Sequence, residues 1–104
     1  MSSTYAQSSI TTTTVVVAVK DQVSADLAGE AVILSLRTSM YYGLNPVGAR
    51  IWALLGAPVR VADICDTIVR EYDVEFDRCE RDVLDVLGQL AGRGLIEIRD
   101  ATNP

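Results

Sequence analysis

The sequence predicts a single α+β domain in which a three-stranded antiparallel sheet is followed by three helices. The chain has 104 residues, which is typical of one domain, and 49% of them are hydrophobic, which is enough for a small core. Short β-branched or alternating apolar segments fill the first half, whereas the second half carries apolar residues at helical spacing. Strands that precede a block of helices, instead of alternating with them, indicate α+β architecture.

Three segments of the first half are expected to pair as a meander. Val15–Lys20 is a β-branched run, and Ala31–Arg37 alternates between two faces as a half-buried strand does. Met40–Leu44 is the third strand. The two residues before it are expected to form a turn, although neither is the usual glycine. The polar segment at residues 21–30 is expected to be a connection.

Three helices are expected at residues 46–55, 61–72 and 76–92. The first has Asn45 as a favoured N-cap and Pro46 at the first helical position, and the residue before a proline is held extended. Apolar residues at intervals of three and four give the other two helices a buried face. Gly94 is expected to end the third helix, and residues 95–98 are expected to add a short strand or an apolar tail.

The two ends of the chain are expected to lie outside the folded domain. Nine of the first fourteen residues are serine or threonine, a composition that favours disorder for residues 1–14. The domain is therefore expected at residues 15–99, with a disordered tail at 100–104. The N-terminus shows no secretory signal and no apolar run is long enough to span a membrane, so a cytoplasmic protein is expected.

Charge and composition exclude several classes of function. The net charge of −5 argues against nucleic acid or an anionic membrane as the main partner. The chain has no histidine, no nucleophile or phosphate-binding motif and no metal-binding spacing, so no enzyme, metal or cofactor is expected. Cys65 and Cys79 lie on apolar stripes and are interpreted as two buried thiols. Asp82 and Asp85 are interpreted as exposed acids on a helix, not as a catalytic pair.

The third strand and the last helix are the expected working surface. Met40, Tyr42 and Leu44 share one face of the strand, and its outer side is free unless another segment covers it. The apolar arc of the last helix is too wide for one neighbour. Either the whole arc is core, or one of its flanks borders a groove beside this strand. An open strand edge beside a groove is typical of a site that binds an extended peptide.

The sequence resembles the PqqD-like family over roughly residues 15–99. The resemblance is carried by YYGLNPVGARIWALL, by VADICDTIVREYDV and by DVLDVLGQLAGRGLIE. Its most specific parts are Tyr42-x-Leu44-Asn45-Pro46-x-Gly48, the Ile51-Trp52 pair, Asp82-Val83 and Gly94-Leu95. The LNPVGARIW variant is most similar to stand-alone members of lasso-peptide biosynthesis. Three residues depart from the family pattern. Ser39 stands where glycine is usual, Arg60 where serine or threonine is usual, and Phe76 where proline is frequent. These departures affect turns and helix caps and not the strand edge.

The resemblance implies a winged-helix-like domain that recognises ribosomally made, modified peptides. The leader segment of a precursor peptide would add as an antiparallel strand to the third strand and lie against the last helix. A separate transglutaminase-like leader peptidase, and also a cyclase, would be the protein partners. The candidate peptide-binding residues are Val32, Ile33, Leu34, Met40, Tyr41, Tyr42, Gly43 and Leu44 from the sheet, and Asp82, Val83, Asp85, Val86, Leu87 and Gln89 from the last helix.

Two alternatives share this scaffold. One is a peptide chaperone that serves a radical enzyme in the biosynthesis of pyrroloquinoline quinone. The other is a winged-helix DNA-binding protein, in which the last helix would enter the major groove. The acids on that helix would repel phosphates, so this alternative is the weaker one.

Overall fold

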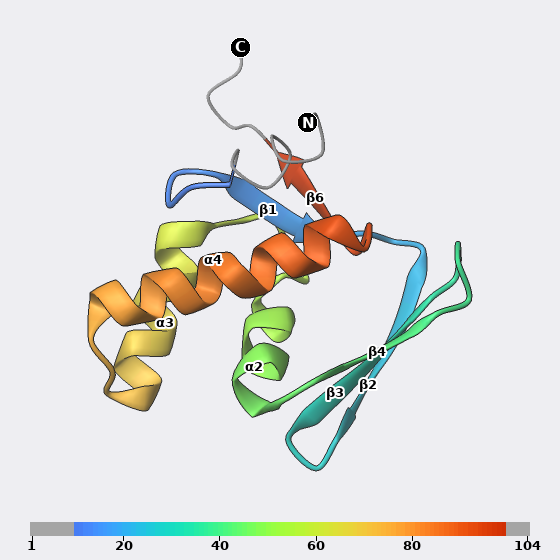
Figure 1. Cartoon of the computed structure of the whole chain (residues 1–104), viewed down its shortest axis with the longest axis horizontal. Coiled ribbons are helices and arrows are strands. Elements are labelled where there is room, and N and C mark those ends of the chain that lie inside the picture. Colours follow the sequence, from blue (N-terminus) through green and yellow to red (C-terminus); the bar gives the residue numbers. More distant parts are fainter. Residues whose placement is uncertain (1–9, 100–104) are drawn as a thin grey trace.

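The computed structural model describes residues 10–99, which form two three-stranded antiparallel sheets and three helices (Figure 1). The elements are β1 (Val15–Ala18), β2 (Gln22–Leu27), β3 (Glu30–Ser35), β4 (Tyr41–Leu44), α2 (Pro46–Leu54), β5 (Val59–Arg60), α3 (Val61–Tyr72), α4 (Phe76–Gly92) and β6 (Ile96–Arg99). The α+β prediction is confirmed, because the antiparallel sheet β2-β3-β4 is followed by α2, α3 and α4. None of the helices in this part of the chain has the length and apolarity needed to cross a membrane.

The strand at the start of the domain belongs to a different sheet from the one predicted. β1 pairs with β5 on one side and with β6 on the other, so the order of this sheet is β5-β1-β6. Val16 is opposite both Val59 and Ile98, and its side chain is completely buried. A β-branched run predicts a strand but does not name its partner, which here comes from the far end of the chain.

The first strand of the meander is β2, within the segment predicted to be a connection. β2 pairs with β3 along its whole length, from Gln22 opposite Ser35 to Leu27 opposite Glu30. Its alternation is hard to see because polar residues occupy the side that faces the domain and most of its residues are exposed. The tight turn between β2 and β3 is Ala28-Gly29, and both residues have the positive φ that such a turn requires. Gly29 is the residue in the sequence that indicates this hairpin.

The turn between β3 and β4 is longer than the two residues predicted. The Ser35 N–H donates to the Met40 carbonyl at 2.9 Å, which closes a turn of four residues. Ser39 in this turn has a φ of +63°, a left-handed conformation that normally favours glycine. The PqqD-like family, which the sequence resembles, usually has glycine at this position. The positive φ explains why glycine is preferred there.

The predicted helix limits are confirmed for α3 and α4, and α2 ends one residue earlier than expected. The Asn45 side chain accepts a hydrogen bond from the Gly48 N–H at 2.8 Å, so this residue is the N-cap of α2. Gly94 follows α4 with a φ of +71°, and the Leu95 N–H returns to the Leu90 carbonyl at 2.9 Å. The chain after this cap forms strand β6 instead of an apolar tail.

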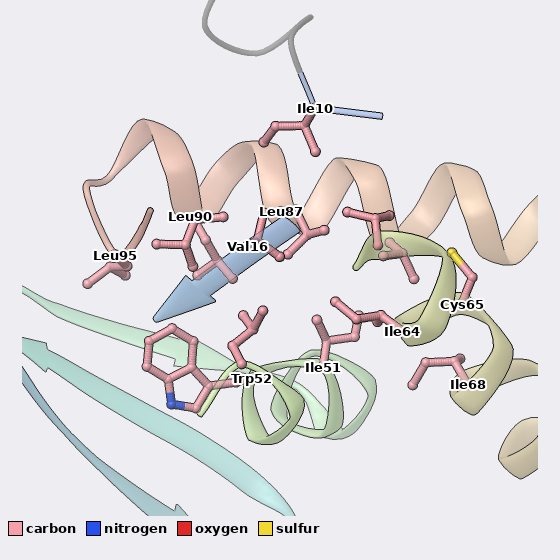
Figure 2. Close-up of a cluster of buried hydrophobic side chains, with 14 of the residues drawn as sticks. Ile10, Val16, Ile51, Trp52, Ile64, Cys65, Ile68, Leu87, Leu90 and Leu95 are labelled. Atoms are coloured by element: carbon pink, nitrogen blue, oxygen red, sulfur yellow. The ribbon is translucent and has the colours of Figure 1, made fainter. Parts of the chain in front are cut away.

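The core lies between the helices and the two sheets. Figure 2 shows Val16 of β1, Ile51 of α2, Ile64 of α3 and Leu87 of α4 pointing into one shared interior. Trp52 closes this interior on the side of the β2-β3-β4 sheet, where its indole N–H donates to the Ser24 hydroxyl at 3.1 Å. This hydrogen bond ties α2 to the β2–β3 hairpin and so fixes the sheet from which the site is built.

The folded domain begins earlier than the predicted residue 15. Ile10 is buried in the core, and the Thr12 and Thr14 carbonyls accept hydrogen bonds from the first two N–H groups of α3. These bonds satisfy N–H groups that Arg60, which makes no side-chain cap, leaves open. The expectations for residues 1–9 and 100–104 lie outside the described residues.

Candidate functional site

Strand β4 has an open side. Among residues 10–99, β4 pairs only with β3, and it is therefore an edge of the β2-β3-β4 sheet. In Figure 1 this sheet extends away from the helices, and β4 runs from the outer turn directly into α2. An edge strand presents N–H and C=O groups that have no ladder partner on that side.

The register shows which backbone groups face the open side. The Ser35 N–H donates a hydrogen bond to the Met40 carbonyl, so Ser35 and Met40 are a hydrogen-bonded pair. In an antiparallel ladder such pairs alternate with pairs that exchange no hydrogen bond. Tyr42 and Leu44, opposite Ile33 and Ala31, therefore direct their backbone groups toward β3. Tyr41 and Gly43 belong to the alternate pairs, so their N–H and C=O groups point to the open side.

The side chains of β4 alternate across the sheet. Tyr42 and Leu44 are half-buried and pack against the core, whereas Tyr41 is 70% exposed on the opposite face. Gly43 shares the exposed face, and a Cβ placed there would meet nothing within 4 Å. The edge is therefore accessible to an extended chain, with one face of that chain directed toward α4 and the other toward solvent.

A groove separates β4 from α4. It encloses about 250 Å³, and one wall comes from the chain at Gly43, Leu44, Asn45 and Gly48. Its other wall is the flank of α4 that carries Asp85, Val86, Gln89, Leu90 and Arg93. The Arg93 guanidinium lies over the Tyr42 ring, 4.9 Å from its centroid, and forms the end of this groove.

A second cavity continues from the groove past the Asn45-Pro46 corner. It encloses about 230 Å³ between the three helices and shares Val86 with the groove. Apolar side chains dominate its lining, which consists of Val47, Ile51, Ile68, Tyr72, Val74, Arg78, Cys79, Asp82, Val83 and Val86. The lining suits one apolar or aromatic side chain of a guest.

An ion pair holds two walls of this second cavity together. Arg50 of α2 donates to both carboxylate oxygens of Glu71 of α3, at 2.8 and 2.7 Å. The hydrogen bond from Arg50 keeps the pKa of the Glu71 carboxyl below its ordinary value. The pair spans α2 and α3, whose side chains line the cavity.

The structure brings most of the predicted site residues together, but not all of them. Gly43, Leu44, Asp85, Val86 and Gln89 line the groove, and Asp82 and Val83 line the second cavity. Tyr41, Tyr42 and the exposed Met40 lie on or beside the edge strand.

Four predicted residues lie elsewhere. Ile33 and Leu87 are completely buried, so they belong to the core and not to the groove surface. Ile33 faces inward because it lies on the same row of the sheet as Ser24 and Tyr42. Val32 and Leu34, one residue to either side, point to the opposite face with Gly43 and Tyr41, away from α4.

Sequence reasoning omitted several residues that line the groove or the second cavity, and three of them are the most informative. Arg93 ends the groove, and Val47 and Tyr72 line the second cavity. The sequence did indicate Arg93, because Arg93 follows Gln89 by four residues and therefore lies on the same side of the helix. Val47 and Tyr72 fell on apolar stripes, and such stripes do not distinguish a cavity wall from core.

Neither cysteine of the chain lines the groove. The two cysteines are free and buried, and burial raises the pKa of the Cys65 thiol to about 12. The Cys79 thiol donates a hydrogen bond to the Cys65 carbonyl at 3.7 Å. Within residues 10–99, no cluster of three acidic, cysteine or histidine side chains is placed to hold a metal ion.

Comparison with known proteins agrees with this geometry. Residues 30–96 match the family model for coenzyme PQQ synthesis protein D (PqqD). The fold is similar to TbiB1, solved in complex with the TbiA(beta) leader peptide, with 42% sequence identity and a TM-score of 0.72 over 78% of this chain and 94% of TbiB1. It is also similar to a lasso peptide synthetase B1 complexed with its leader peptide, with 26% identity and a TM-score of 0.70 over 79% of this chain and 96% of the other.

A search of curated proteins finds no match. The family model covers more than half of the chain, and both similar structures are matched over nearly their whole length. The resemblance inferred from the sequence motifs is thereby confirmed. The chain belongs to the PqqD family.

Proposed function

We propose that this protein binds the leader segment of a ribosomally made precursor peptide without catalysing a reaction on it. The leader adds as an antiparallel strand to the open side of β4 and lies against α4. The observation that carries the proposal is the outward direction of the Tyr41 and Gly43 backbone groups beside a groove. Two similar structures were solved with leader peptides, which supports the same class of ligand here.

The edge supplies affinity that does not depend on the guest's side chains. Tyr41 and Gly43 each offer one N–H and one C=O to an incoming strand, and each hydrogen bond contributes about 1 kcal/mol net. Strand addition of this kind binds an extended peptide through its backbone and selects it through pockets for alternate side chains.

The groove and the second cavity supply selectivity. One face of the bound leader points toward α4, where it meets Val86, Gln89 and Arg93. Residues at the N-terminal end of the leader strand continue past the Asn45 corner, where an apolar or aromatic side chain enters the second cavity. Burying one such side chain contributes about 1.5–3 kcal/mol.

The expected affinity is in the micromolar range. Backbone pairing and two or three buried side chains together outweigh the cost of ordering a free leader, which is about 2–5 kcal/mol. A net binding free energy of about −8 kcal/mol corresponds to a Kd of about 1 μM. Such an affinity suits a protein that must release its guest after processing.

The bound leader presents the precursor to a separate leader peptidase and then to a cyclase, in the maturation of a lasso peptide. The similarity to a lasso peptide synthetase B1 favours this pathway. The family description favours a second candidate, a peptide chaperone for a radical enzyme in the synthesis of coenzyme PQQ. The neighbouring genes distinguish the two, because one predicts a transglutaminase-like peptidase and the other a radical enzyme.

Titration of a fluorescein-labelled leader tests the proposal. The probes are the TbiA(beta) leader peptide and the leader of the precursor encoded beside this chain, each with a scrambled control. We expect a saturable rise in anisotropy at micromolar concentrations for at least one leader and none for its scrambled form. No saturable binding of either leader at tens of micromolar would contradict the proposal.

A further inference from the structure

The groove wall on α4 changes charge along its length. Asp85, Gln89 and Arg93 follow one another at intervals of four residues and therefore form one row along the helix. All three line the groove beside β4. The row thus runs from an acid through a neutral amide to a base, in the direction of the chain.

The cation of this row is held in place. The Arg93 guanidinium rests over the Tyr42 ring, and no carboxylate of residues 10–99 forms an ion pair with it. Stacking on the ring fixes the position of the charge and leaves its N–H groups available to a guest.

The anion of the row is the Asp85 carboxylate. Asp85 accepts a hydrogen bond from the neutral Gln89 side chain at 3.2 Å, and no cation in the described part of the chain pairs with it. Asp82, one turn earlier, differs because it lies 4.0 Å from Arg78. The opposite charges at the two ends of the groove are therefore Asp85 and Arg93.

The relative direction of β4 and α4 determines in which direction a guest strand passes along this row. Tyr42 meets Arg93, and Leu44 shares the groove with Asp85 and Gln89. Val47 shares the second cavity with Asp82 and Val83, which come earlier on the helix. The two elements therefore run antiparallel, as Figure 1 also shows. A guest that pairs antiparallel with β4 runs in the same direction as α4, from Asp85 toward Arg93.

The spacing of the two charges matches the repeat of a strand. Asp85 and Arg93 are eight residues apart, which is about 12 Å along a helix. An extended strand covers that length in about four residues, at roughly 3.3 Å each. Side chains four residues apart on a strand point to the same face, so both can face α4 together.

We propose that the groove recognises a leader strand with a basic residue followed four positions later by an acidic residue. The basic side chain is paired with Asp85 and the acidic side chain with Arg93. The charge order therefore selects both the direction and the register of the bound leader. This inference rests on the proposed function and adds to it a sequence class for the ligand.

A charge scan of the leader tests the order. The probes are fluorescein-labelled variants of the TbiA(beta) leader peptide in which a Lys-x-x-x-Glu pair is moved along the peptide one residue at a time. A second set carries Glu-x-x-x-Lys at the same positions. In one register we expect the Lys-first peptide to bind about threefold to tenfold more tightly than its Glu-first partner, as two exposed ion pairs allow.

A charge swap in the protein provides the matched test. The double variant Asp85→Lys/Arg93→Glu keeps the net charge and is expected to prefer the Glu-first peptide in that same register. Arg81→Glu is the control, since Arg81 is exposed on α4 and lines neither cavity. The control is expected to keep the wild-type preference.

Three results would overturn the inference. They are equal affinities of the two sets in every register, a wild-type preference for the Glu-first set, and a preference that the double variant leaves unchanged. In each case the parent leader still binds, so the proposed function stands. Failure of both the parent TbiA(beta) leader and the leader encoded beside this chain to bind the wild-type protein would overturn the two proposals together.

Discussion

Replacing Gly43 by proline is the sharpest perturbation of the open edge. The Gly43 N–H points away from β3, so its loss breaks no hydrogen bond of the β3–β4 ladder. The added ring lies on the exposed face, where nothing occupies the space of a Cβ. Tyr42 before it is already extended, as a residue before proline must be. We therefore expect the variant to fold with little change in stability.

The expected effect on binding follows from the same geometry. The proline removes one of the two N–H donors of the open side and leaves a carbonyl of the leader without its partner. A lost hydrogen bond with an unsatisfied acceptor costs about 1–3 kcal/mol. The leader should then bind at least about fivefold, and up to about a hundredfold, more weakly.

Gly43→Ala is the matched control, because alanine adds a Cβ at the same place and keeps the N–H. Anisotropy titration with a labelled leader gives the Kd of each variant, and thermal unfolding by circular dichroism shows that each one is folded. We expect near wild-type binding for the alanine variant and weak binding for the proline variant. A folded proline variant with the affinity of the alanine variant would refute strand addition at β4.

Three further predictions concern the scaffold. Ser39→Gly should stabilise the domain by about 0.5–1 kcal/mol in urea unfolding, because Ser39 has a positive φ; Ser39→Ala should give no such gain. The lowered pKa of Glu71 means that its pair with Arg50 adds stability above the ordinary glutamate pKa of about 4.3 and loses it as the pH falls below. Glu71→Gln should therefore make urea unfolding less sensitive to acid between about pH 5 and pH 3; equal sensitivity in both proteins would contradict this. The buried thiols of Cys65 and Cys79 should react with a disulfide reagent at about pH 8 only as fast as the protein opens, and rapid reaction in the native state would contradict their burial.

Much of this fold could be predicted from local signals. The Asn45-Pro46 corner, the limits of α3 and α4 and the glycine cap at Gly94 all follow from residue chemistry within a few positions. The pairing of β1 could not be predicted in this way. β1 has partners about 40 and 80 residues away in the chain, and only the packed domain determines that choice.

The two faces of β4 could be predicted from the sequence, and the lining of the groove only in part. The pattern of β4 put Tyr42 and Leu44 on one face and Tyr41 on the other, as the structure has them. The alternation of β3 was also clear, but it does not show which of its faces meets α4. That information comes from the register with β4, which puts Ile33 in the core and Leu34 on the far face.

The central claim is that a guest strand occupies the open side of β4, and amide hydrogen exchange at single-residue resolution tests it most directly. The Tyr42 and Leu44 N–H groups face β3 and should be protected with or without a leader. The Tyr41 and Gly43 N–H groups should exchange fast in the free protein and become protected when a leader saturates it. A saturated complex in which these two amides still exchange as fast as in the free protein would contradict the account.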